Sequence, residues 1–138
     1  MRYLLDASAL LVHYREDTGW EMVQALFDDR SAELMVTGPS LVAFGQELAR
    51  LGASSASARE VVTAYASLID TVVPVDREAA FAALDLLLAQ PASLHLAEAL
   101  SCAAAQVSAA TLVHSSPSLA ELRVENLAQL SIKRGSDF

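Results

Sequence analysis

The sequence predicts an α/β fold, a three-layer α/β/α sandwich around a central, mainly parallel sheet of four to five strands. Short apolar or β-branched runs of strand length alternate with longer segments whose apolar residues recur at helical spacing. Alanine is abundant, with 26 residues in a chain of 138, whereas aromatic residues make up 6%. This composition favours closely packed helices over a β-sandwich, which needs more β-branched and aromatic residues.

The first half of the chain predicts two strands, at residues 2–5 and 34–36. A helix begins at Ala7, with Ser8 available to bond its first turn, and a second helix ends near Arg30. Residues 37–40 supply a loop and the start of a third helix, which Gly52 ends. A short serine-rich linker at 54–57 then precedes a helix over 58–68.

The second half predicts three further strands, at 71–75, 110–113 and 127–130. Asp76 caps a helix that ends at Gln90-Pro91, because proline disfavours helix in the residue before it. Ser93 begins another helix, which runs to about residue 107. A loop at 114–118 carries a turn of helix behind it. Residues 1–130 are expected to form one domain and residues 131–138 a polar C-terminal tail.

Charge and cysteine content limit the function classes. The net charge is −8 and the pI is about 4.7, so the chain as a whole repels nucleic-acid phosphates and any contact with RNA must be local. The single cysteine, Cys102, cannot form an intramolecular disulfide, which indicates a reducing setting. No segment reaches the roughly 18 apolar residues of a membrane span. We therefore expect a cytoplasmic protein with no membrane partner.

The carboxylate of Asp6 stands where the first strand ends and the first helix begins. An aspartate at such a junction is by itself more often a helix cap than a ligand. Parallel sheets, however, bind ligands beyond the carboxyl ends of their strands, and Asp6 lies at such an end. The question is therefore which other side chains reach the same edge.

Four further side chains are candidates for this edge. The helix expected from Ser93 would bring Glu98 toward Asp6, and the loop after the strand at 110–113 offers Ser115 and Ser116. Glu47, on the helix after the second strand, would join them. Two carboxylates that converge near water require a cation or a proton. Mg²⁺, or Mn²⁺ in its place, suits such a pair and supports phosphodiester hydrolysis by activating water and clamping phosphate oxygens.

Three stretches together are similar, in order and spacing, to a known family. They are YLLDASALLVHYREDTGWEMVQALF, VVPVDREAAFAALDLL and SLHLAEALSCAAAQVSAATLVHSSPSL. The last one resembles the family's Ser-Leu-Ala-Asp-Ala-Leu stretch, alanine-rich helix, Ala-Thr-Leu-Val-Thr strand and turn with Asp. The chain as a whole resembles the PIN domain family, in particular the VapC-type toxins of bacterial toxin–antitoxin pairs. The resemblance implies a PIN-like fold and a Mg²⁺-dependent endoribonuclease, usually a homodimer silenced by an antitoxin peptide.

The resemblance also implies three or four acidic residues, of which this chain keeps only part. Asp6 matches the first acid, with its accompanying hydroxyl at Ser8, and Glu98 takes the place of the usual Asp at the third position. Ser116 stands where the fourth acid is expected. The family's second acid, a Glu on the helix after the second strand, falls on Ala43, Phe44 or Gln46, depending on register. Glu47 lies one turn beyond Ala43 and would have to reach back.

We expect Asp6, Glu98 and Ser116 to form the catalytic set, and Asp6, Glu98 and Glu47 to hold the metal. Ser8, Ser115 and His114 would support them. Affinity for the ion should fall with fewer charged ligands, so activity is expected to be weakened. Arg15, Arg50 and Arg123 are candidates for phosphate contact, although solvated surface charge is the simpler interpretation of each.

Two alternatives remain open. The first is a catalytically inactive PIN-like domain that serves as a protein-binding or dimerisation module. The second is an unrelated fold of the flavodoxin or receiver type, which ranks low because receiver domains carry an acidic pair in the first loop and here only Asp6 precedes Ala7. Zinc spacing, a glycine-rich phosphate loop and a Gly-x-Ser-x-Gly elbow are all absent from the sequence.

Overall fold

The computed structural model describes residues 1–89, 94–124 and 126–132. Within these ranges strands and helices alternate as the sequence predicts. The strands are β1 (Arg2–Leu5), β2 (Glu33–Thr37), β3 (Thr71–Val73), β4 (Thr111–His114) and β5 (Gln129–Ser131). The helices are α1 (Ala7–Arg15), α2 (Trp20–Asp28), α3 (Gly38–Arg50), α4 (Ser55–Leu68), α5 (Arg77–Ala89), α6 (Leu96–Ser108) and α7 (Pro117–Ala120).

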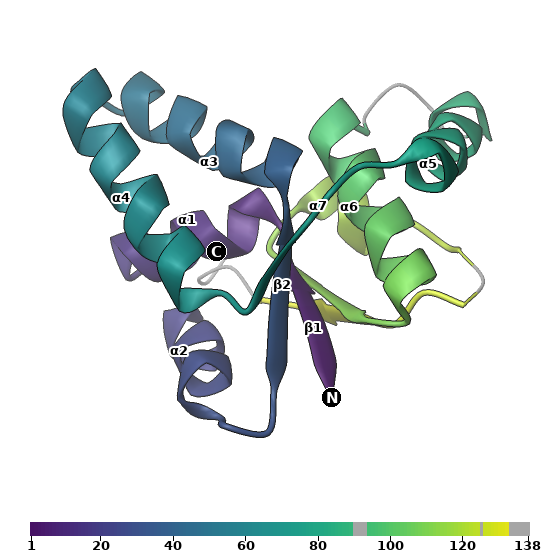
Figure 1. The fold of residues 1–138 in the computed structure, drawn as a ribbon, viewed down its shortest axis with the longest axis horizontal. Coiled ribbons are helices and arrows are strands. Elements are labelled where there is room, and N and C mark those ends of the chain that lie inside the picture. Colours follow the sequence, from purple (N-terminus) through teal and green to yellow (C-terminus); the bar gives the residue numbers. More distant parts are fainter. Residues whose placement is uncertain (90–93, 125, 133–138) are drawn as a thin grey trace, which may run out of the picture.

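The five strands form one sheet in the order β3-β2-β1-β4-β5, and every neighbouring pair is parallel. The prediction of a parallel sheet of four to five strands is confirmed. All strands point the same way, so their carboxyl ends meet at one edge. The chain passes from β1 in the centre to β2 and β3 on one side, and later to β4 and β5 on the other (Figure 1).

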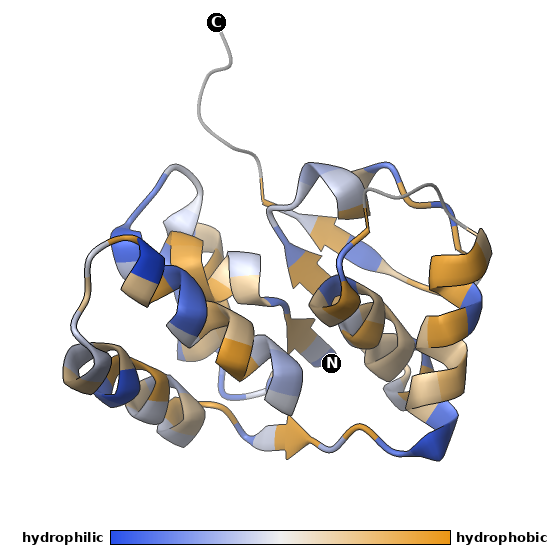
Figure 2. Ribbon diagram, turned by 90° about the horizontal axis from the view of Figure 1, so that it is seen from above, coloured by the Kyte–Doolittle hydropathy of each residue, from blue (hydrophilic) through white to orange (hydrophobic). Residues whose placement is uncertain are grey.

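Alternate side chains of the central strands enter opposite layers. Leu4, Met35 and Leu112 belong to a buried cluster with α6, whereas Leu5 and Val113 belong to a cluster formed with α1 to α4. Figure 1 shows α1 to α4 on one side of the sheet and α5 and α6 on the other. In Figure 2 the strands are mostly coloured as hydrophobic, whereas the helices show both colours. The central strands are thus buried on both faces, and the α/β/α sandwich is confirmed.

Two expected element boundaries are wrong because a side chain caps a helix earlier than predicted. The residues 54–57 are not a linker, since Ser54 accepts a hydrogen bond of 3.1 Å from the Ser57 amide and α4 starts at Ser55. No loop separates β2 from α3, because Thr37 ends the strand and caps the helix through a bond of 3.1 Å from the Ser40 amide.

Other boundaries differ by a few residues. β3 ends at Val73 rather than at residue 75. The expected helix end at Gln90-Pro91 and the expected start at Ser93 lie outside the described residues, and α6 begins at Leu96. β5 reaches Ser131, and Ile132 is buried in the core, so the packed domain extends two residues past 130. Residues 133–138 of the expected tail lie outside the described part of the chain.

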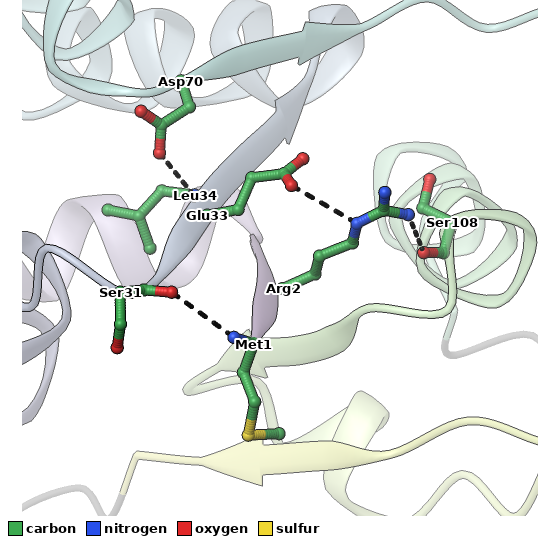
Figure 3. Close-up of polar contacts among 7 residues, drawn as sticks. All are labelled: Met1, Arg2, Ser31, Glu33, Leu34, Asp70 and Ser108. Atoms are coloured by element: carbon green, nitrogen blue, oxygen red, sulfur yellow. Dashed lines mark hydrogen bonds and ion pairs between the residues drawn. The ribbon is translucent and has the colours of Figure 1, made fainter.

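Polar contacts hold the opposite, amino-terminal edge of the sheet (Figure 3). Arg2 pairs with Glu33 at 3.3 Å and donates to the carbonyl of Ser108 at 3.0 Å, which ties β1 to β2 and to the end of α6. The Asp70 carboxylate accepts a bond of 2.7 Å from the Leu34 amide. These contacts join neighbouring elements and therefore have a structural role. The candidate functional residues lie at the carboxyl edge.

No helix in the described ranges is both long and apolar enough to cross a membrane.

Candidate functional site

Asp6 caps α1 and is nearly inaccessible, with 2% of its surface exposed. Its Oδ2 accepts bonds from the Ser8 amide at 3.2 Å and from the Ser8 hydroxyl at 2.8 Å, and its Oδ1 accepts one from the Ser101 hydroxyl at 3.2 Å. Asp6 therefore caps the helix, as is common for an aspartate at such a junction, and Ser8 donates to it. A carboxylate has about four acceptor positions, so these three bonds leave little capacity unused.

Burial raises the pKa of Asp6 above its usual value of 3.8. The hydrogen bonds from Ser8 and Ser101 act in the opposite direction, because they stabilise the charged form. The charge of Glu98 raises the pKa further, which indicates that the two carboxylates are close enough to repel each other. Both carboxylates of the pair that the sequence analysis selected line one cleft.

Glu98 lies in the first turn of α6 and is half-buried. One of its carboxylate oxygens accepts a bond of 3.0 Å from the His95 amide, which completes a capping box. The other oxygen accepts a short hydrogen bond from the Ser116 hydroxyl. Glu98 is therefore both a helix-capping residue and a partner of the β4–α7 turn.

A cleft of about 1070 Å³ opens between α3 and α6 at this edge. Asp6, Glu98 and Glu47 all line it. All three positions considered for the family's second acid, Ala43, Phe44 and Gln46, line the cleft, and the Phe44 side chain is fully buried. A side chain at position 43 or 46 could thus enter the cleft.

Glu47 is engaged by Arg50, one turn further along α3. Arg50 donates to it through Nε at 2.9 Å and through a second, short bond. The bond from Arg50 is the main reason that the pKa of Glu47 is lowered, and the charge of Arg15 adds to this effect. Glu47 therefore lies on the rim of the cleft as half of an exposed ion pair.

His114 ends β4, and Ser115 and Ser116 form the turn to α7; none of the three lines the cleft. The Ser115 amide donates to the Ser8 hydroxyl at 3.0 Å, and Ser115 lines a smaller pocket next to the cleft. His114 is fully buried, and its ring contacts the Ser116 amide and Gln129. His114 thus supports the turn from inside and does not reach the cleft.

Two buried serines were missed by the sequence analysis. Ser101 donates to Asp6, and because its only proton is used there, Ser40 must donate to Ser101 across a distance of 2.8 Å. Ser101 follows Glu98 by three residues and so shares its helix face, which is a signal that the sequence contained. No comparable signal exists for Ser40, because it lies 61 residues from its partner.

The residues at this edge fit a magnesium or manganese ion only in part. Within the described ranges, no group of three or more His, Cys, Asp or Glu side chains is placed to hold a metal ion together. Mg²⁺ binds through one or two carboxylates and keeps several waters, so Asp6 and Glu98 meet its minimum requirement. The mutual repulsion of the two carboxylates would be relieved by such an ion.

The thiol of Cys102, next to Ser101 on α6, is expected to resist chemical modification in the native protein. Burial first, and then the charges of Asp6 and Glu98, raise the pKa of Cys102 to about 12, so almost no thiolate exists at pH 8. Reaction with a disulfide reagent such as DTNB should be at least about 100-fold slower in buffer than in denaturant. Equal rates would show that α6 opens readily.

The chain matches no family model and no curated protein, but it matches solved structures over most of its length. A chain of the VapBC2 structure from Rickettsia felis, bound to promoter DNA, is 13% identical with a TM-score of 0.73, covering 96% of this chain and 100% of its own. A chain of DNA-bound VapBC from Salmonella typhimurium has the same identity and TM-score, covering 96% and 99%. VapC20 from Mycobacterium tuberculosis, a sarcin-ricin loop cleaving toxin, is 13% identical with a TM-score of 0.69, covering 88% and 96%. This chain therefore has the PIN-like fold of the VapC toxin structures.

Proposed function

We propose that this protein is a VapC-type endoribonuclease, the toxin of a toxin–antitoxin pair, that depends on Mg²⁺ or Mn²⁺ and has weakened activity. One observation carries the proposal. Asp6 and Glu98 line the same cleft at the carboxyl edge of a parallel sheet, and the charge of Glu98 raises the pKa of Asp6. The PIN-like fold, shared with a toxin that cleaves the sarcin-ricin loop, supports RNA as the substrate.

Each residue has a defined task in this proposal. Asp6 and Glu98 hold the ion, which when bound supplies an activated water and a positive charge beside the scissile phosphate. Ser8 orients Asp6 through a bond of 2.8 Å. The Ser115 amide in turn holds the Ser8 hydroxyl, and Ser116 orients Glu98. These hydroxyls direct the carboxylates but add no charge, which is why we expect weak binding of the ion.

The proposal is tested by incubating the protein with an RNA hairpin of the sarcin-ricin type in Mg²⁺, in Mn²⁺ and in EDTA. Cleavage that requires the ion and is lost in Glu98→Gln supports the proposal. Glutamine keeps one oxygen that can accept from Ser116 and removes the charge, at the cost of the bond from the His95 amide at the exposed start of α6, and circular dichroism checks that the fold survives. Cleavage that persists in EDTA or in Glu98→Gln would point to a contaminating nuclease and would contradict the assignment.

A binding module without catalysis is the second candidate. Two contacts favour it. Glu47 forms an ion pair with Arg50, and Glu98 accepts a hydrogen bond from the Ser116 hydroxyl, so both carboxylates have partners in the absence of a metal ion. In that case the acidic cleft would bind a basic antitoxin peptide. Absence of both Mn²⁺ binding and cleavage, with retained binding of a cognate antitoxin, would select this candidate.

An antitoxin peptide and a second copy of the chain are the proposed protein partners. The structural neighbours include VapBC toxin–antitoxin complexes, which supports an antitoxin. Phe81, Leu88 and Leu96 are 55%, 76% and 66% exposed, which supports burial of an apolar surface in a homodimer. Light scattering during gel filtration would decide the oligomeric state, and a monomer at 100 μM would contradict the dimer.

Removal of the Arg50 charge is expected to raise the affinity for Mn²⁺. Arg50→Gln frees Glu47 and deletes the only arginine that lines the cleft among the described residues, so the dissociation constant should fall by about threefold to tenfold. Arg59→Gln removes the same charge from an exposed site outside the cleft and serves as the control. Calorimetric titration measures both variants. Equal effects would mean that only net charge matters.

A further inference from the structure

We propose that His114 and Gln129 are positioning residues that hold Ser116, and through it Glu98, from inside the sheet. The inference rests on the proposed function in so far as Glu98 serves as an ion ligand. His114 is the last residue of β4 and Gln129 the first residue of the neighbouring strand β5, and neither side chain lines the cleft. They therefore act only through Ser116.

The hydrogen bonds fix the tautomer of His114. A backbone N–H can only donate, so the bond of 3.2 Å from the Ser116 amide makes Nδ1 an acceptor and leaves the ring proton on Nε2. Nε2 then donates to Oε1 of Gln129 at 2.8 Å. The Gln129 amide is oriented in turn by its own donation to the carbonyl of Leu122 at 3.3 Å. The ring is held at both nitrogens in one orientation.

Ser116 links the fixed ring of His114 to Glu98 in the cleft. Its backbone is held by His114, its hydroxyl donates to Glu98, and the same oxygen accepts a bond of 3.3 Å from the Leu119 amide. The hydroxyl has one proton and two acceptor positions, so these two bonds determine its direction. A shift of the Ser116 backbone would therefore move the group that orients Glu98.

The position of His114 argues for a task beyond filling the core. Leu112 and Val113, which precede it in β4, are apolar and fully buried, as is His114 itself. A buried polar side chain must be hydrogen-bonded to offset its loss of hydration, and even then it is often no more stabilising than an apolar side chain of similar volume, so core packing alone gives no reason for a histidine here. Here the hydrogen bonds of His114 hold Ser116, which in turn orients Glu98, a ligand in the proposed site.

A pair of substitutions at His114 separates positioning from packing. Asparagine places an oxygen near the position of Nδ1 and keeps an acceptor for the Ser116 amide, whereas leucine removes it and keeps apolar volume. We expect His114→Leu to weaken Mn²⁺ binding about tenfold, as typical for a residue behind a ligand. His114→Asn should recover most of this loss, although both variants lose the bond to Gln129.

A double-mutant cycle of His114→Leu with Ser116→Ala tests whether His114 acts on Glu98 through the Ser116 hydroxyl. Without the Ser116 hydroxyl, His114→Leu should no longer change Mn²⁺ affinity, while its effect on the melting temperature persists. Independent, additive losses of affinity would overturn the proposal, as would His114→Asn binding no better than His114→Leu. The control is His13→Asn in α1, another histidine bonded at both ring nitrogens, which should lower the melting temperature and leave Mn²⁺ affinity unchanged.

Nuclear magnetic resonance of the metal-free protein keeps this proposal distinct from the proposed function. It should show a protonated Nε2 and a bare Nδ1 in His114, and His114→Leu should speed hydrogen exchange at the Ser116 amide by at least about tenfold, with His114→Asn close to native. If these results hold but Mn²⁺ does not bind, the positioning stands and the nuclease proposal fails. A proton on Nδ1, or unchanged exchange in His114→Leu, would overturn the positioning.

Discussion

Replacement of Asp6 by asparagine is expected to stabilise the metal-free protein at neutral pH while it lowers the affinity for Mn²⁺ by about 100-fold or more. The loss of affinity follows from removing one of only two ligand charges. The gain in stability follows from burial, which raises the pKa of Asp6 and so opposes its charged form. Asparagine can still accept from the Ser8 amide through its oxygen, and its amide group can donate to Ser101.

The stability difference between wild type and Asp6→Asn should depend on pH, in a direction set by the raised pKa of Asp6. A folded-state pKa above the unfolded value of about 3.8 means that the folded protein binds more protons in the interval between the two. The contribution of Asp6 to stability is therefore lost as pH rises through that interval. The advantage of Asp6→Asn should be present at neutral pH and should shrink as pH falls toward 3.8.

Thermal melts of both proteins in EDTA, from pH 4 to pH 8, measure this difference. Addition of Mn²⁺ should stabilise the wild type by mass action and leave Asp6→Asn unchanged. Asp29→Asn is a control of opposite sign, because hydrogen bonds from Ser31 lower the pKa of the exposed Asp29. A variant of Asp6 that is less stable than wild type by the same amount at every pH would contradict the argument.

Replacement of Ser116 by aspartate should have the largest effect on stability. Ser116 is 7% exposed and donates to Glu98, so the change deletes a donor and puts a second negative charge against Glu98. The free energy of unfolding of the metal-free protein should fall by about 3 kcal/mol at neutral pH, the range for an unpaired buried charge. Aspartate can still accept from the Leu119 amide, so α7 keeps its cap.

Mn²⁺ should reverse this loss of stability, because the aspartate at position 116 would be a third carboxylate ligand and the bound ion would offset its repulsion with Glu98. Urea unfolding with and without Mn²⁺ measures both effects, and the dissociation constant should fall by about tenfold. Combination with Ala43→Glu and Glu98→Asp should lower it further, since Ala43 lines the cleft. Ala49→Glu adds the same charge at an exposed position of α3 that does not line the cleft. Equal gains from position 49, or no gain at all, would count against position 43 as the place of the family's second acid.

Local patterns were sufficient for most of the fold. A strand and a helix each bury a characteristic spacing of apolar residues, so the alternation of the two periods predicted the order of the elements and the parallel sheet. The errors fall at short polar segments, where one side chain decides where a helix begins. Ser54 is such a case, since a serine-rich stretch suits both a linker and the capped first turn of α4.

The candidate site was predictable where it depends on topology. Parallel strands expose their carboxyl ends at one edge, so Asp6 could be assigned to that edge from its place after the first strand. The approach of Glu98 followed from the position of its helix in the sandwich. Ser8 and Ser116 were also named, but the buried partners Ser40 and Ser101 were not. Ser40 and Ser101 meet only because α3 and α6, from opposite sides of the sheet, approach each other at its carboxyl edge.

The sequence by itself determined the layers of this protein, the edge at which a ligand would bind and the two carboxylates assigned to it, because these depend on period and chain order. Only the tertiary structure decided how far each carboxylate is already hydrogen-bonded or ion-paired, and so how far it is available to bind a metal ion. It buried Asp6 among serine hydroxyls, paired Glu47 with Arg50 and placed His114 beneath Ser116. Some of these contacts, such as Asp6 with Ser101, join residues distant in the chain. The others are local, but they depend on side-chain rotamers that the packing of the folded protein selects.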